Sequence, residues 1–156
     1  METIEHILLA SDGSEHALHA GAFCGMLARA TGAGITVITV HNEDVIMLNA
    51  MGPAMWPATV PYGSMTSDEI RSAVEKSASE TLLPSTCEAC GEDCTINDCV
   101  QKWGQPAEVI CEYAQEQQCD LIVAGTRGRS SFGKLLLGSV STQITNHAHC
   151  PVTLVR

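Results

Sequence analysis

A glycine- and serine-rich segment, residues 125–141, contains the residues whose types and spacing best suit binding chemistry. It carries Arg127, Arg129 and Lys134, which are three of the eight basic residues in a chain of formal net charge −10. Glycine lets a backbone N–H group approach an anion without a Cβ in the way, and a helix N-terminus adds partial positive charge. The segment therefore predicts an anion site, such as one for phosphate. The alternative is a solvated surface loop with incidental charges.

The sequence lacks residues that two other nucleotide-binding motifs require. Gly128, Gly133 and Lys134 have the spacing of a P-loop, but Leu135 stands where that motif requires a Ser or Thr to bind Mg²⁺. The first predicted strand is followed by Gly13 alone, and not by the three glycines of a dinucleotide fingerprint. The sequence also contains no nucleophile elbow and no H-E-x-x-H motif, so we expect little or no catalysis.

A second candidate site is a cluster of cysteines: Cys87, Cys90, Cys94 and Cys99. Such short spacing can bind Zn²⁺. Cys94 and Cys99 flank a predicted strand and are expected to point to opposite faces, so both cannot bind one ion. Cys87, Cys90 and Cys94 could bind zinc with a fourth ligand from elsewhere, but free thiols and a disulfide from Cys94 to Cys87 or Cys90 are the alternatives. The remaining cysteines are interpreted as small buried hydrophobic residues: Cys24, Cys111, Cys119 and Cys150.

The elements that must position these residues alternate between short apolar strands and helices. Continuous apolar runs are typical of strands buried on both faces of a parallel sheet, and the runs here predict strands over residues 7–10, 35–40, 121–124 and 151–155. A weaker pattern predicts a further strand, third in the chain, over residues 95–100. Helices are predicted over residues 15–30, over 66–83 with Pro84 as the stop, from residue 105 onward, and over 139–148. Residues 42–65 have no clean period and are predicted to be a long loop. The pattern predicts a parallel α/β sheet with helices on both faces.

The composition limits the partners of the chain. Its 156 residues are 45% hydrophobic and 17% charged, which is typical of one globular domain, assigned to residues 1–156. The net charge argues against nucleic acid and against an anionic membrane surface. No apolar run approaches the roughly 20 residues that span a bilayer, and residues 1–5 lack the basic start of a signal peptide. We therefore expect a cytoplasmic protein whose cysteines are thiols or metal ligands rather than disulfides.

The spacing Gly125-x2-Gly128-x9-Gly138-Ser139 resembles, in full, the nucleotide-binding motif of the universal stress protein family. The resemblance extends to residues 7–14, 104–108 and 147–152, and so covers most of the chain outside the long loop and the cysteine cluster. It implies a single doubly wound five-stranded parallel sheet in the order 3-2-1-4-5. The complete glycine motif is similar to that of the ATP-binding members of the family.

The resemblance also implies a site, at the switch between strands 1 and 4 where ligands of open α/β sheets bind. Asp12 resembles the residue near adenine and ribose, although a turn residue that caps the first helix is the alternative. Val40 resembles a backbone contact to adenine. The residues that resemble the family's ribose and phosphate contacts are Gly125, Arg127, Gly128, Gly138, Ser139, Val140 and Ser141.

The function that this resemblance implies is a cytoplasmic stress-response protein that binds ATP, with or without Mg²⁺, or another adenine nucleotide as a regulatory ligand. Two alternatives remain open: a slow nucleotide hydrolase or phosphotransferase, and a thiol or metal sensor that uses the cluster from Cys87 to Cys99. Residues 151–155 are apolar and end the sheet order, so we expect a homodimer through this strand, as the family resemblance also implies. The alternative is a monomer in which residues 42–65 cover their own domain.

Overall fold

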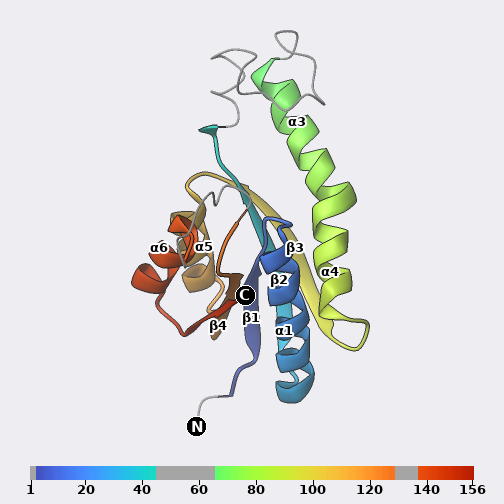
Figure 1. Ribbon diagram of the computed structural model, residues 1–156, viewed down its shortest axis with the longest axis vertical. Coiled ribbons are helices and arrows are strands. Elements are labelled where there is room, and N and C mark those ends of the chain that lie inside the picture. Colours follow the sequence, from blue (N-terminus) through green and yellow to red (C-terminus); the bar gives the residue numbers. More distant parts are fainter. Residues whose placement is uncertain (1–2, 45–65, 129–136) are drawn as a thin grey trace.

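The computed structural model describes residues 3–44, 66–128 and 137–156, and Figure 1 shows them as one twisted sheet between two layers of helices. The five strands are parallel and follow the order β3-β2-β1-β4-β5, which confirms the predicted fold class. Most of the predicted long loop, residues 45–65, lies outside the described residues. The elements are β1 (His6–Ala10), α1 (Glu15–Thr31), β2 (Gly34–His41), α3 (Ser67–Ser77), the π-helical segment η2 (Ala78–Leu82), α4 (Leu83–Cys90), β3 (Thr95–Trp103), α5 (Pro106–Glu116), β4 (Leu121–Gly125), α6 (Ser139–His147) and β5 (Val152–Val155).

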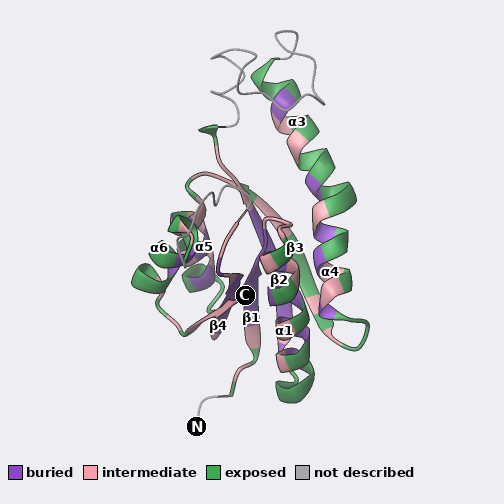
Figure 2. Ribbon diagram, viewed as in Figure 1, coloured by how far each residue is buried: buried purple, intermediate pink, exposed green. Residues whose placement is uncertain are grey.

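The central strand β1 is apolar on both faces because both faces are covered. Ile7 and Leu9 pack into a core with α1 and α4, whereas Leu8 and Ala10 pack into a second core with α5 and α6. The side chains of Ile7, Leu8 and Leu9 have no exposed surface. Figure 2 shows the buried residues gathered in the inner strands and on the inward faces of the helices, while α3 is mostly exposed. No helix among the described residues is both long and apolar enough to cross a membrane.

Helix α1 begins and ends where the sequence predicts. Ser14 is its N-cap, with the side-chain oxygen accepting a hydrogen bond from the Ala17 N–H, and Gly32 ends it in the left-handed conformation, with φ of 79°. Its buried face is made of small residues, which lets α4 come close. The closest approach is at Gly25, where an added Cβ would overlap the backbone carbonyl of Cys90.

The helix that begins after Thr66 does not end at Pro84, so that prediction is wrong. The predicted capping box is present, because Thr66 and Glu69 each accept a hydrogen bond from the backbone N–H of the other. The helix then passes through η2, where the Leu83 N–H bonds to the carbonyl of Ala78, five residues earlier. A proline inside a regular helix loses one hydrogen bond and clashes with the carbonyl four residues before it. The wider π-helical turn just before Pro84 accommodates the proline, and the helix continues to Cys90.

Strand β3 is longer than predicted and contains an irregularity that changes which way its side chains point. It extends to Trp103, and its register against β2 shifts so that Ile35 pairs with Ile96 while Thr36 pairs with Asp98. Asn97 is therefore an extra residue in a β-bulge. Because of the bulge, Cys99 pairs with Val37, whose side chain belongs to the core that Cys94 and Ile96 also contact. Cys94 and Cys99 thus share one face of the sheet, and the prediction of opposite faces is wrong because it counted alternation without a bulge.

The contact at Gly25 predicts a stability difference between two glycines on the same helix face. Gly25→Ala would force α4 away from α1 and should lower the free energy of unfolding by about 2 kcal/mol or more. Gly21→Ala is the matched control, because its Cβ would lie 3.2 Å from the Ala89 Cβ, which needs only a small shift, while alanine also improves helix propensity. Urea denaturation measures both. Equal stability of the two variants would show that α4 can move without cost.

Candidate functional site

A cavity of about 550 Å³ lies at the carboxyl ends of β1, β2 and β4, where the strand order reverses. The N-terminal parts of α5 and α6 form its other wall. The structure brings all the residues of the predicted nucleotide site to this one cavity: Asp12, Val40, Gly125, Arg127, Gly128, Gly138, Ser139, Val140 and Ser141. Volumes of 300–1,000 Å³ are usual for small-molecule sites, so the cavity is large enough for a nucleotide.

The turn after β1 places Asp12 on the cavity wall and also uses it structurally. Its Oδ1 accepts a hydrogen bond from the Ser14 N–H at 3.0 Å, and Gly13 between them has φ of 73°. The Ser14 hydroxyl donates to the carbonyl of Arg127 at 3.3 Å, while it also accepts from α1 as its N-cap. Asp12 therefore is a turn residue, as the alternative interpretation proposed, but the cap of α1 is Ser14, and Asp12 lines the cavity as well.

Two glycines allow the end of β4 to lie against this turn. A Cβ on Gly125 would lie 2.8 Å from the backbone carbon of His16 and 3.0 Å from the backbone nitrogen of Ala17, both in the first turn of α1. A Cβ on Gly128 would overlap the Oδ2 atom of Asp12. A side chain at position 125 would push the end of β4 away from the first turn of α1, whereas one at position 128 would displace the Asp12 carboxylate from its place on the cavity wall.

The start of α6 is held against the end of β4 by short hydrogen bonds. The Gly138 N–H donates to the carbonyl of Thr126 at 2.8 Å, and the Ser141 hydroxyl donates to the carbonyls of Thr126 and Gly125 at 3.0 and 3.2 Å. The first N–H groups of a helix have no acceptor within that helix and carry its partial positive charge. Here those groups belong to residues on the cavity wall, so the site offers donors to an anion. Residues 129–136, with Arg129 and Lys134, lie outside the described residues.

The cavity is also lined by polar residues that the sequence did not single out, and Asn42, Asp44 and Gln105 are among them. They follow the carboxyl ends of β2 and β3, which meet at the same edge of the sheet as β1 and β4. Their position just beyond the carboxyl ends of predicted strands could have identified them as candidate site residues. With them, the described charged residues on the wall are Asp12, Asp44 and Arg127.

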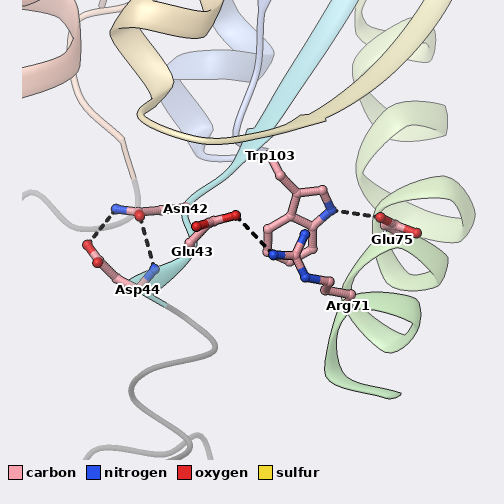
Figure 3. Close-up of polar contacts among 6 residues, drawn as sticks. All are labelled: Asn42, Glu43, Asp44, Arg71, Glu75 and Trp103. Atoms are coloured by element: carbon pink, nitrogen blue, oxygen red, sulfur yellow. Dashed lines mark hydrogen bonds and ion pairs between the residues drawn. The ribbon is translucent and has the colours of Figure 1, made fainter. Parts of the chain in front are cut away.

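A polar network beyond β2 connects this rim to α3 (Figure 3). The Asn42 side-chain amide donates to the Asp44 carboxylate at 2.7 Å, and the Asp44 backbone N–H donates to the Asn42 side-chain oxygen at 3.0 Å. The neighbouring Glu43 accepts from Arg71 at 2.9 Å, and the Arg71 guanidinium lies 4.7 Å from the centre of the Trp103 ring. The indole N–H of Trp103 donates to the Glu75 carboxylate at 2.7 Å. The end of β3 therefore holds α3 beside the chain that forms the cavity rim.

The cysteine cluster does not assemble as the zinc hypothesis required. The thiol of Cys90 is buried and donates to the carbonyl of Thr86, and the thiol of Cys94 donates to the carbonyls of Gly91 and Cys90. Burial raises the pKa of Cys90 to about 12, so it is a protonated thiol. Within the described ranges, no group of three His, Cys, Asp or Glu side chains could hold a metal, and this includes Cys87, Cys90 and Cys94.

The scattered cysteines are only partly as interpreted. Cys24 and Cys119 are buried, whereas Cys111 and Cys150 are half-buried at the edge of the core that faces α5 and α6. Burial raises the pKa of each of these four thiols. All four are thus packing residues with little thiolate at neutral pH.

Comparison with known sequences relates the whole chain to one family. The sequence profile of the universal stress protein family matches residues 3–156. A universal stress protein of Thermus aquaticus is 32% identical over 96% of this chain and 97% of its own length. The universal stress protein YxiE of Bacillus subtilis is 31% identical with the same coverage.

Comparison with solved structures agrees on the fold. The universal stress protein UspA from Lactobacillus plantarum superposes with a TM-score of 0.70 at 20% identity, over 100% of both chains. A universal stress protein in complex with cAMP gives a TM-score of 0.60 at 22% identity, over 99% of this chain and 98% of that one. One from Archaeoglobus fulgidus in complex with dAMP gives 0.59 at 20% identity, over 100% of both.

The network in Figure 3 predicts that Trp103 fixes α3 in place. Trp103→Ala removes both the ring beneath Arg71 and the donor to Glu75, so amide hydrogen exchange in residues 67–77 should speed up by roughly tenfold or more. Lys76→Ala is the control, since Lys76 is exposed on the same helix and its ion pair to Glu80, at 3.9 Å, is a weak surface contact. If both variants exchange at the wild-type rate, α3 does not depend on this contact.

Proposed function

Because the chain belongs to the universal stress protein family, we propose that it is a cytoplasmic stress-response protein that binds an adenine nucleotide, ATP foremost, as a regulatory ligand. The observation that carries this proposal is the convergence of the glycine motif, the α6 N-terminus and Asp12 on one cavity at the switch of the sheet. The glycine motif and the α6 N-terminus have the chemistry to bind phosphates, and Asp12 has the chemistry to bind a ribose hydroxyl. The cavity also has the size that such a ligand needs.

The proposed orientation follows from the charges of the wall. The start of α6 supplies N–H donors, and Arg127 and Gly128 lie beside it on the same wall, so the phosphates belong at this end. Asp12 is a carboxylate, which accepts hydrogen bonds from hydroxyl groups, so the ribose belongs beside it. The adenine then lies toward Val40 at the end of β2, among apolar residues that include Ile38 and Ile110.

Two structural neighbours support an adenine nucleotide as the class of ligand. One was solved with cAMP and the other with dAMP, as their names state. ATP, and Mg²⁺ as its companion, are the finer part of the proposal. They rest on the resemblance of the complete glycine motif to the ATP-binding members.

We further propose that the nucleotide is bound with little or no hydrolysis. The Ser141 hydroxyl donates to two backbone carbonyls, which commits it to holding α6 in place and not to attacking a phosphate. Slow hydrolysis or phosphoryl transfer is the alternative from the enzyme class, and phosphate release under saturating ATP and Mg²⁺ distinguishes the two.

Gly128→Val tests the assignment of the phosphate end. The branched side chain would displace the Asp12 carboxylate and block the backbone, and ATP binding should weaken at least tenfold, or about 1.4 kcal/mol. Isothermal titration calorimetry with ATP measures the change, and titration with GTP should show the weaker binding expected for guanine. Ser72→Val is the control because it adds the same side chain at an exposed position on α3, outside the cavity. Equal ATP affinity for wild type and Gly128→Val, both folded by circular dichroism, would falsify the assignment.

We also propose that two copies pair through β5. In the described part of the chain β5 pairs with β4 and ends the sheet. The carbonyls of Pro151 and Val155 accept from Ile122 in β4 and from Thr126 just after it. By alternation, the N–H and carbonyl groups of Val152 and Leu154 therefore point to the open edge. Half-buried apolar side chains with an open row of donors and acceptors suit an antiparallel pairing with a second copy of the same edge.

Leu154→Pro should break this dimer because proline has no N–H to donate across the edge, while the bonds to β4 are made by other residues. Leu154→Ala is the matched control, since it shortens the same side chain but keeps the N–H. Sedimentation equilibrium should give a dimer for wild type and Leu154→Ala and a monomer for Leu154→Pro. A monomeric wild type, or a dimer that survives Leu154→Pro, means that β5 is not the interface.

A further inference from the structure

Two cysteines that are twelve positions apart face each other across the junction of α4 and β3. The Sγ atoms of Cys87 and Cys99 are 3.3 Å apart and make a thiol–thiol hydrogen bond. Both are free thiols in this structure. A disulfide has its sulfurs about 2.05 Å apart, so the pair needs an approach of little more than 1 Å to become covalent.

Two irregularities of the fold bring these two thiols together: the π-helical turn before Pro84 and the β-bulge at Asn97. The π-helical turn before Pro84 lets the helix continue far enough to carry Cys87 alongside the sheet. The bulge at Asn97 then turns Cys99 to the face of β3 that α4 covers. On that same face Gln101 bonds to Ser79 in η2 and Trp103 bonds to Glu75 in α3. The cysteine pair is therefore one of a row of contacts that dock the helical arm onto β3.

We propose that Cys87 and Cys99 are a redox-modification site that forms a reversible intramolecular disulfide when the protein meets a hydroperoxide. Cys99 is exposed and can be reached by a small oxidant, whereas Cys87 is half-buried behind it. Disulfides that form inside cells are typically transient and redox-sensing. The site is independent of the proposed nucleotide binding, because neither cysteine lines the cavity.

The chemistry balances in two steps. The Cys99 sulfur attacks the terminal oxygen of the hydroperoxide ROOH, so that an S–O bond forms, the O–O bond breaks, and the alcohol ROH leaves with the thiol proton. Cys99 is then a sulfenic acid. The Cys87 sulfur attacks the Cys99 sulfur, the S–S bond forms, the S–O bond breaks, and the hydroxide leaves as water with the Cys87 proton. Two thiols are oxidised by two electrons in total, and the peroxide bond is reduced.

The neighbouring thiols are less suited to this reaction. Cys90 is buried, and Cys94 directs its proton to backbone carbonyls and not to a sulfur. Burial raises the pKa of Cys87 to about 12, so Cys87 carries little thiolate at neutral pH and is not the sulfur that reacts first with the oxidant. It attacks in the second step because its sulfur already lies 3.3 Å from that of Cys99. The order of events therefore follows from exposure, with Cys99 attacked first.

Peptide mapping after oxidation tests the proposal on the full chain. Reduced protein is treated with a few equivalents of hydrogen peroxide, alkylated, and digested by an enzyme that cuts after Glu. Cleavage after Glu88 and Glu92 separates Cys87 from Cys90 and from the peptide that carries Cys94 and Cys99, whereas trypsin would leave all four in residues 77–102. We expect an intact-mass loss of two hydrogens, a cross-link between residues 81–88 and 93–108, and full reversal by dithiothreitol.

Variants identify which sulfurs take part. Cys94→Ser should leave the cross-link unchanged, because the Cys94 thiol donates to backbone carbonyls and not to a sulfur, and it is the matched control for a cysteine in the same peptide. Cys99→Ser should abolish the cross-link and the reversible mass loss. In the wild type the closed loop should also raise the melting temperature by roughly 5 °C over the reduced protein. Cys87 and Cys99 that stay separately alkylated after peroxide, or a cross-link lost in Cys94→Ser, would overturn the proposal.

Discussion

The burial of β1 on both faces is the constraint on which the rest of this molecule depends. Complete burial of Ile7, Leu8 and Leu9 stabilises the fold by about 1.5–3 kcal/mol per side chain, and that gain requires helices on each side of the sheet. The parallel crossovers that supply those helices run first toward β3 and then toward β5. The reversal leaves the end of β1 uncovered beside the end of β4, and the cavity is the space that results.

The two cores have different consequences for function. The core that contains Leu8 and Ile144 closes under the cavity and holds α5 and α6, whose first turns form its far wall. The core that contains Leu9 and Cys24 holds α1 and α4, and β3 closes its edge through side chains that contact the helical arm. Trp103 is the last of these contacts and also lies beside the cavity rim, 5.0 Å from the ring of His41. The arm thus connects the cysteine pair to the rim of the cavity along one face of β3.

The sheet and much of the cavity wall could be predicted from the sequence because both depend on local signals. Continuous apolar runs mark strands buried on both sides, and glycines mark close approaches, of a backbone at Gly125 and of the Asp12 carboxylate at Gly128. The errors lie where a single residue changes the regular hydrogen-bond pattern of a helix or the alternation of side chains along a strand. A proline such as Pro84 normally ends a helix, but here the π-helical hydrogen bond from the Leu83 N–H to the Ala78 carbonyl accommodates it. Asn97 shifts the alternation of β3, so the pairing of Cys87 with Cys99 could not be derived from spacing. Asn42 and Asp44 were missed because their role depends on position beyond a strand end and not on a motif.

The bulge at Asn97 also has a consequence for tracing the ancestry of this chain. The bulged residue makes no pair with β2, so its deletion would leave Ile35 opposite Ile96 and Val37 opposite Cys99. A homologue without the extra residue could therefore hold the same two thiols in the same place at eleven positions apart instead of twelve. An alignment that forbids a gap in this strand would then match Cys99 with the wrong column. The history of the thiol pair has to be followed in three dimensions, with an indel of one codon allowed inside the strand.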